Sequence, residues 1–236
     1  MDMTSIKVLL EALTSVGIDE AVLEPVDGGT LVRGANKDLN VIVYDIVDDT
    51  LVEYPLGIQS VRGLLSRLNL FETAKAVIEV EARDGRVVDI MIKQGRKKAS
   101  YKCAEPSSLS VPKKVPGDLD ITNSIVFNSE YVDHVTQAVS AMSFTGSKAE
   151  RTVSIAVKDN VATFSIFDGE DDTFSDELDV DFPDIRAVSW EVSPFQRVMK
   201  QALDSNSKEC RFTITEYGIA VFDLSGINIL VAPVSR

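Results

Sequence analysis

Residues 192–203 read VSPFQRVMKQAL, and this stretch decides how the rest of the chain is interpreted. At about 100° per residue, a helix here would have one apolar face and one polar face. Ser193 is the expected cap, and Pro194 suits the first helical position because proline has no N–H to leave unpaired. The apolar face would hold Phe195, Val198, Met199, Ala202 and Leu203, and the free face Gln196, Arg197, Lys200, Gln201 and Asp204. Such a helix packs its apolar face on a sheet, so function must be sought on the free face.

The stretch SVRGLLSRLNLF, residues 60–71, repeats this pattern in the first half of the chain. Ser60 is the expected cap, and no acid occurs between Tyr54 and Phe71. The apolar stripe would be Val61, Leu64, Leu65 and Leu68, and the free face Arg62, Gly63, Ser66 and Arg67. The whole chain has a formal charge of −13, which repels nucleic acid and membranes. The two basic faces are therefore either ordinary solvated faces or a local surface that faces phosphates.

A repeat of layout surrounds these two helices, because each half is predicted to run helix, strands, helix, strands. The first half opens with a predicted helix over 4–17 and the second with one over 129–142, where Ser129 is the expected cap and Tyr131, Val135, Ala138 and Met142 form the inner face. Alternation and turn residues predict strands at 20–26, 30–35, 39–46, 76–82, 86–93 and 98–104, and again at 151–158, 161–168, 173–180, 209–216, 219–224 and 227–234.

Residues 106–120 form a predicted linker, since prolines there stand among serines, charges and a glycine. The linker separates a predicted first domain, 1–105, from a second, 121–236. The expected fold class is α+β, with two similar domains, each of antiparallel strands with two helices on one face.

Composition narrows the class of protein further. An apolar content of 44% without any long apolar run predicts a folded chain with no membrane span. The first ten residues have no basic region, so no signal peptide is expected. Cys103 and Cys210 lie far apart and form no CxxC, which favours two reduced thiols and a cytoplasmic location.

The sequence contains few residues that could catalyse a reaction. His134 is the only histidine, and no Ser-His-Asp, Cys-His or His-rich metal set can be assembled around it, so we expect no enzyme and no cofactor. The acidic run 168–184 leaves one alternative open, a metal-dependent nuclease. Its candidate ligands are Asp168, Asp171, Asp172 and Asp184, while the simpler interpretation of this run is a solvated outer loop and strand.

The paired repeats, the proline-rich connector, the acidity and the basic helix faces together resemble the DNA sliding clamps, the ring-shaped processivity factors of replicative polymerases. The stretch INILVAPV, residues 227–234, is similar to the last strand of the cellular clamps. The helices match the cellular sequences less well, so the resemblance favours a divergent phage clamp in the host cytoplasm.

The resemblance implies a function and a set of partners. The chain would close as a head-to-tail homotrimer around double-stranded DNA, without reading its sequence, and would tether the DNA polymerase for processive synthesis. An ATP-dependent clamp loader would be a further partner. A different class of protein is the alternative, an acidic two-repeat adaptor or virion structural protein that does not encircle DNA.

The resemblance also implies two sets of site residues. The DNA-facing cations would be Arg62, Arg67, Arg197 and Lys200, with Lys7 and Lys148. The helices at 4–17 and 129–142 are less basic than the family's lining helices usually are. Partners would dock in an apolar pocket between the connector and the last strand, made by Leu109, Val111, Ala232, Pro233 and Val234. Alternatively, Leu109 and Val111 cover the domain junction.

Overall fold

The computed structural model describes residues 2–114, 123–142, 151–168, 172–206, 208–224 and 226–234. The chain divides into two compact units, Met1–Val115 and Pro116–Arg236, at a point inside the predicted linker. Among the described residues, no helix has both the length and the apolar character that crossing a membrane requires.

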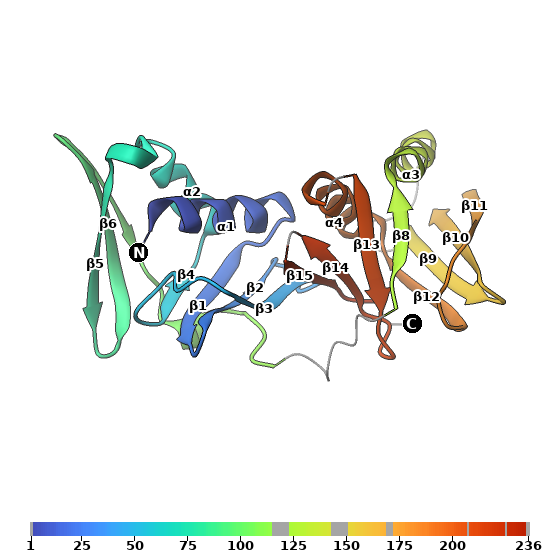
Figure 1. Ribbon diagram of the computed structural model, residues 1–236, viewed down its shortest axis with the longest axis horizontal. Coiled ribbons are helices and arrows are strands. Elements are labelled where there is room, and N and C mark those ends of the chain that lie inside the picture. The colour runs from blue at the N-terminus through green and yellow to red at the C-terminus, as the bar shows by residue number, and fades with distance from the viewer. Residues whose placement is uncertain are drawn as a thin grey trace. The chain divides into compact units, whose positions relative to one another are not determined.

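Residues 2–114 of unit 1 form two helices and seven strands (Figure 1). In chain order its elements are α1 (Met3–Ser15), β1 (Glu20–Val26), β2 (Gly29–Ala35), β3 (Val41–Val47), β4 (Leu56–Ile58), α2 (Val61–Leu68), η1 (Thr73–Lys75), β5 (Val77–Arg83), β6 (Arg86–Gln94), β7 (Lys97–Lys102) and η2 (Pro106–Ser108). The strands make two antiparallel arrays within the unit, in the orders β4-β1-β2-β3 and β5-β6-β7.

The core of unit 1 follows from the helical and the alternating periods of apolar residues in its sequence. Helix α2 buries the predicted stripe of Val61, Leu64, Leu65 and Leu68, and α1 buries Ile6, Leu9, Leu10 and Leu13 at the same helical spacing. The strands contribute alternate residues from one face, such as Val32, Val43, Ile90 and Ile92. The tight β1–β2 turn needs glycine twice, because Gly28 has φ +86° and a Cβ on Gly29 would lie 2.1 Å from the carbonyl oxygen of Val47.

The described residues of unit 2 form two helices and eight strands. In chain order its elements are β8 (Ile125–Asn128), α3 (Ser129–Ala141), β9 (Arg151–Lys158), β10 (Val161–Asp168), β11 (Asp172–Asp179), β12 (Ile185–Glu191), α4 (Val192–Ser205), β13 (Glu209–Ile214), β14 (Ala220–Leu224) and β15 (Ile227–Val231). Its antiparallel arrays have the orders β12-β9-β10-β11 and β8-β13-β14-β15.

Aromatic rings fill the core of unit 2 where aliphatic side chains fill that of unit 1. Phe195 of α4 lies at its centre, with ring centroids 5.2 Å from Trp190 and 5.2 Å from Phe222. Phe212 stacks on Phe222 at 4.9 Å. Stacked and edge-to-face ring contacts like these add to the free energy gained by burying the rings.

The two units are structural repeats whose described strands differ by one. The arrays β4-β1-β2-β3 and β12-β9-β10-β11 correspond strand for strand, as do β5-β6-β7 and β13-β14-β15. In each unit the two helices lie next to each other on one side of the strands (Figure 1). Strand β8 has no counterpart among the described residues of unit 1. The predicted α+β class, with two similar units, is confirmed.

Local details differ from the sequence expectations at the helix ends. Asn128, not Ser129, caps α3, because its Oδ1 accepts from the N–H of Tyr131 at 2.8 Å. Helix α4 begins at Val192, so Pro194 is its third residue, still within the turn where a missing N–H costs nothing. Ser60 caps α2 as predicted, accepting from Gly63 N at 3.0 Å. The inner face of α3 is shifted, and its buried residues are Val132, Val135 and Val139.

Three strands were not predicted: β4 and β8, with three and four residues, and β12, with seven. Each lies in a stretch without a strong alternating pattern, and each is a strand because a longer neighbour pairs with it.

Candidate nucleic-acid and partner-binding surfaces

Helix α4 presents the two predicted cations to solvent. Its apolar face is buried, with Phe195 only 1% exposed, which orients the opposite face outward. Arg197 and Lys200 are exposed on that face, and within the described residues neither forms an ion pair with an acid. Two unpaired cations one turn apart can attract phosphate groups, though exposure to water keeps the attraction weak and dependent on salt.

Helix α2 carries two arginines whose side chains differ in how firmly they are held. Arg62 is exposed and forms no ion pair among the described residues. Arg67 is held against the unit, because its Nε donates to the carbonyl of Ser100 at 3.0 Å and its Nη1 to that of Gly63 at 2.7 Å. Its guanidinium also lies 5.4 Å from the centre of the Tyr101 ring. Arg67 therefore provides a fixed positive charge, whereas Arg62 can reach toward a ligand.

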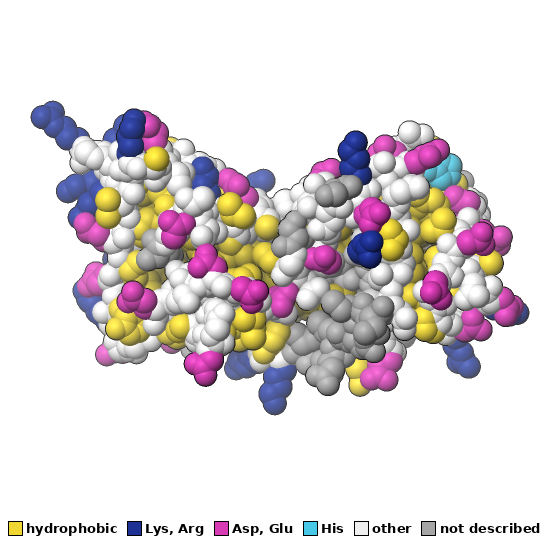
Figure 2. All heavy atoms as spheres, viewed as in Figure 1, with side chains coloured by type: hydrophobic (Ala, Val, Ile, Leu, Met, Phe, Trp, Pro, Cys, Tyr) yellow, Lys and Arg dark blue, Asp and Glu magenta, His cyan; other side chains and the backbone are white. Residues whose placement is uncertain are grey.

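A third basic group lies at the β6–β7 turn and was missed as a site. Arg96, Lys97 and Lys98 are consecutive and all exposed. The turn is joined to the segment after α2, since the side-chain oxygen of Gln94 accepts from the N–H of Glu72 at 3.1 Å. Figure 2 shows Lys and Arg side chains gathered over this end of unit 1. The sequence signal was three adjacent cations in a strongly acidic chain.

The other two helices contribute little positive charge. Lys7 of α1 is half-buried, and α3 exposes Glu130 and Asp133 but contains no Lys or Arg. Lys148 lies outside the described residues. The charge is also uneven between the units, since unit 1 has 15 Lys and Arg against 17 Asp and Glu, and unit 2 has 9 against 20. The net repulsion of a polyanion is thus weaker on unit 1 than on unit 2.

An open groove of about 550 Å³ lies in unit 1, on the face of β1–β3 opposite Val32. Leu109 and Val111 line it together with Leu31 of β2 and Tyr44 of β3. The structure therefore brings the two predicted connector residues to one apolar surface. The remaining lining residues are mostly polar: Glu24, Arg33, Pro55, Asp84, Gly85, Arg86, Glu105, Pro106, Ser107 and Lys113.

Polar bonds fasten the connector beside this groove. The N–H of Ser110 donates to Oε2 of Glu20 at 2.8 Å. Arg33 forms an ion pair with Glu24 at 2.6 Å and donates to the carbonyl of Pro112 at 3.4 Å. Because Ser110 and Pro112 are both held, Val111 between them is fixed at the groove, and the adjacent Leu109 is kept half-buried there.

The C-terminal part of the predicted pocket belongs to unit 2. Ala232, Pro233 and Val234 are half-buried there, and the N–H of Val234 donates to the carbonyl of Ser189 at 2.8 Å. Each part of the pocket is thus held within its own unit, and a joint pocket stays a prediction.

Of the acidic residues proposed as metal ligands, Asp168 and Asp184 contact other residues of the chain. Asp168 is buried beside Arg151, with 3.8 Å between Oδ1 and Nε. Asp184 accepts from the N–H of Asp159 at 3.0 Å and so fixes the β9–β10 turn. Asp171 and the side chain of Asp172 lie outside the described residues. Within the described ranges, no three His, Cys, Asp or Glu side chains come close enough to hold a metal ion.

The histidine and the thiols are also placed by the structure. His134 is exposed, with Nε2 3.6 Å from Oδ2 of Asp176. Both cysteines are free. Burial, with a smaller effect from the charge of Asp89, raises the pKa of the Cys103 thiol to about 12, and burial also raises the pKa of Cys210. Neither thiol is a ready nucleophile at neutral pH.

Comparison with known proteins shows the fold. No protein-family model and no curated sequence matches the chain. Among solved structures, it is similar to the proliferating cellular nuclear antigen of Entamoeba histolytica, with TM-score 0.64 and 16% identity over 96% of this chain and 94% of that one. It is equally similar to that of A. fulgidus bound to the C-terminal region of FEN-1, with TM-score 0.65 and 16% identity over 100% and 97% of the two chains.

A bacterial structure shares the fold as well. The DNA polymerase III beta subunit of Pseudomonas aeruginosa gives a TM-score of 0.70 at 11% identity, covering all of this chain and 64% of that one. These likenesses show a sliding-clamp fold in two units. They also confirm the antiparallel α+β architecture, while the site residues are tested by none of them.

Proposed function

We propose that the chain is a DNA sliding clamp that closes around duplex DNA and tethers a replicative polymerase. The observation that carries the proposal is the equivalence of α2 and α4 in a duplicated sliding-clamp fold: both bury an apolar face and expose cations. A clamp needs weak attraction to phosphates that is independent of sequence, and exposed Arg and Lys on helix surfaces supply it. The chain acts as an accessory protein and not as an enzyme.

The oligomer that this function requires is a homotrimer. Each chain has two repeats, and β7 and β11 are array edges within the described residues of their own units. Unpaired edges favour association, and a head-to-tail contact that closes by rotation gives a ring. The low identity to the cellular clamps supports a divergent, phage-type clamp that works in the host cytoplasm.

Partner docking is the second part of the proposal. Two of the similar structures hold a partner segment, the C-terminal region of FEN-1 in one and a DNA ligase peptide in the other. The groove at Leu109 and Val111 offers a fastened apolar surface with a polar rim, which suits a peptide with one or two hydrophobic anchors. We expect the polymerase and the clamp loader to bind there.

Retention on closed DNA tests the proposal. The protein is loaded on a nicked circular plasmid by its clamp loader with ATP, and the complex is then filtered in high salt. A ring should stay on the circle and slide off after the plasmid is linearised. Equal loss from circular and linear plasmid would instead favour the adaptor, and cleavage of the plasmid with Mg²⁺ would favour the nuclease.

A further inference from the structure

The difference between the repeats leaves one strand edge open. In unit 2, β8 pairs antiparallel with the outer edge of β13, with Cys210 opposite Phe127 and Phe212 opposite Ile125. The counterpart of β13 in unit 1 is β5. Among residues 2–114, which the structure describes in this unit, no strand pairs with the outer edge of β5. An unpaired edge exposes a row of N–H and C=O groups that can bind another strand.

Strand β8 also completes the core of unit 2. Phe127 is 2% exposed, and its ring lies 5.1 Å from that of Phe212 and 4.6 Å from that of Tyr131. With β8 in place, the inner residues of β13 are all buried: Cys210, Phe212 and Ile214. The added strand thus supplies both backbone pairing and one aromatic ring that packs under the sheet.

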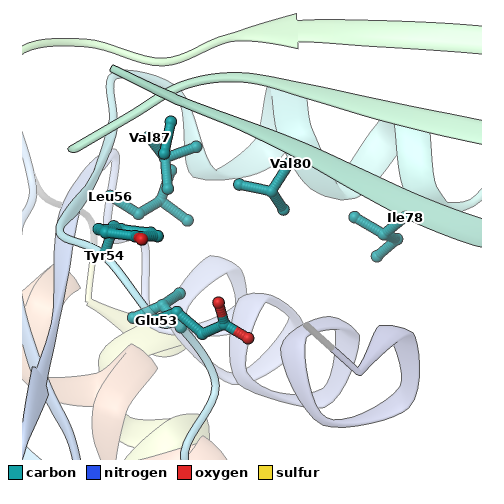
Figure 3. A pocket seen from close by; sticks show the side chains of 8 residues that line it. Glu53, Tyr54, Leu56, Ile78, Val80 and Val87 are labelled. Carbon is teal, nitrogen blue, oxygen red and sulfur yellow. The ribbon is translucent and has the colours of Figure 1, made fainter. Parts of the chain in front are cut away.

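In unit 1, the inner face of β5 borders a cavity. A cavity of about 190 Å³ lies under β5, lined by Ile78, Val80 and Ala82 of that strand, with Val52, Glu53, Tyr54, Leu56 and Val87 (Figure 3). Ile78 and Val80 lie opposite Ile92 and Ile90, which are fully buried, so they belong to the inner face of the array. Yet Val80 is 39% exposed. Within the described residues, the inner face of β5 is therefore only partly covered.

We propose that β5 binds an extended peptide of a partner protein, which adds to the array as an antiparallel strand and inserts one aromatic side chain into the cavity. The repeat in unit 2 defines the chemistry of this peptide as apolar-x-aromatic, the pattern of Ile125 and Phe127 in β8. A dry cavity of about 150 Å³ can hold benzene, so the cavity under β5 can take a phenyl ring. Backbone pairing gives such a strand affinity, and alternate side chains give it specificity.

The charges around the cavity further restrict which peptides can bind there. Glu53 is exposed at the cavity, and its carboxylate disfavours an acidic side chain nearby. On the other face of β5, Glu79 is already paired with Lys93, at 2.5 Å, and Glu81 with Arg83. The two cations here, Lys93 and Arg83, are therefore already paired with carboxylates and would attract an acidic peptide only weakly. A neutral or basic strand fits best.

The test uses a labelled peptide NSIVFNS, the sequence of residues 123–129, and the full chain. We expect saturable binding by fluorescence anisotropy and slower hydrogen exchange of the backbone amides of residues 77–83. Replacing the peptide's Phe by Ala should weaken binding at least tenfold. Methylating alternate backbone nitrogens of the peptide should have a similar effect, since it removes donors without changing the side chains.

A pair of protein variants locates the site. Val80→Glu places a charge at the cavity and should weaken binding at least tenfold. Val77→Glu is the matched control, because Val77 is 59% exposed on the opposite face of β5, and it should bind as the wild type does. Thermal unfolding of both variants shows whether they fold.

Three results would overturn the proposal. Absence of binding and of exchange protection in the wild-type protein would show that the edge takes no such strand. Equal binding by Val80→Glu would place the peptide elsewhere, for example at β13 after displacement of β8. A change of oligomeric state in Val80→Glu without peptide would show that a second copy, not a partner peptide, covers β5.

Discussion

A single buried hydroxyl holds the loop after β3 in unit 1. Thr30 is fully buried, and its Oγ1 donates to the carbonyl of Asp49 at 2.8 Å and accepts from the N–H of Leu51 at 2.9 Å. Thr30→Val keeps the shape but leaves these groups without that partner, so we expect the free energy of unfolding to fall by about 1–3 kcal/mol. Urea denaturation measures it. Thr30→Ser keeps the hydroxyl and is the control, and equal stability of the Val variant and the wild type would contradict this role.

The raised pKa of Cys103 predicts low thiol reactivity. Only the thiolate reacts with iodoacetamide, and a folded pKa of about 12 leaves little thiolate at pH 8–10. In the urea-unfolded chain, labelling should level off above the usual thiol pKa of 9.0, whereas labelling of native Cys103 should still be rising. Mass spectrometry distinguishes Cys103 from Cys210, and Cys103→Ser is the control. Equal rates in native and unfolded protein would refute the prediction.

The same shift has a consequence for stability with a definite sign. Between pH 9 and 12 the folded chain keeps the Cys103 proton while the unfolded chain loses it. The contribution to stability is therefore complete below pH 9 and is lost as the pH rises through this window.

At the scale of elements, the outward face of α4 is the sharpest test of DNA contact. Reversing Arg197 and Lys200 to Glu should reduce loading onto circular DNA at low salt about tenfold or more and lower the salt dependence of loading, because phosphate contacts are lost. The unfolding free energy should change by no more than about 0.5 kcal/mol, since both side chains are exposed.

A matched control separates local contact from net charge. Lys158 and Arg186 are exposed on strands of the same unit, and changing both to Glu alters the net charge by the same amount. We expect normal loading at low salt in this control. Equal losses in the two double variants would mean that α4 has no special contact with DNA.

The connector groove predicts a separate defect in partner binding. Leu109→Lys should weaken the affinity for the C-terminal peptide of the cognate polymerase by about 1–3 kcal/mol, the usual effect of losing one anchor contact. Leu39→Lys, at a leucine that is 49% exposed in a turn of the same unit, is the matched control. Calorimetric titration measures both. Wild-type affinity in Leu109→Lys would place the peptide site elsewhere.

At the scale of the whole molecule, the duplicated fold predicts an oligomer of three chains. Two repeats per chain and unpaired array edges favour a closed head-to-tail ring. Light scattering at micromolar concentration should give a mass near three times 25.8 kDa, and electron microscopy should show rings. A monomer across the whole concentration range would contradict the trimer.

The sequence by itself determined the elements whose signals are local. The apolar stripes of α2 and α4, the Ser60 cap and the long alternating strands depend on residues a few positions apart, and all are where the patterns predicted them. The duplicated order of elements followed from these signals. For the same reason the exposure of Arg62, Arg197 and Lys200 could be predicted, because a helix that buries one face must expose the other.

Only the tertiary structure decided the features that join distant residues. Arg67 is fixed by the carbonyl of Ser100, 33 positions away, and Leu109 is held at its groove beside Leu31. Residues 125–128 form strand β8 because β13, more than 80 residues later, pairs with them. The open edge of β5 could not be predicted either, because no local sequence pattern indicates whether a neighbouring strand is present. Four residues are too few to specify a strand, so its existence depends on the free energy of packing Phe127 among rings from other elements.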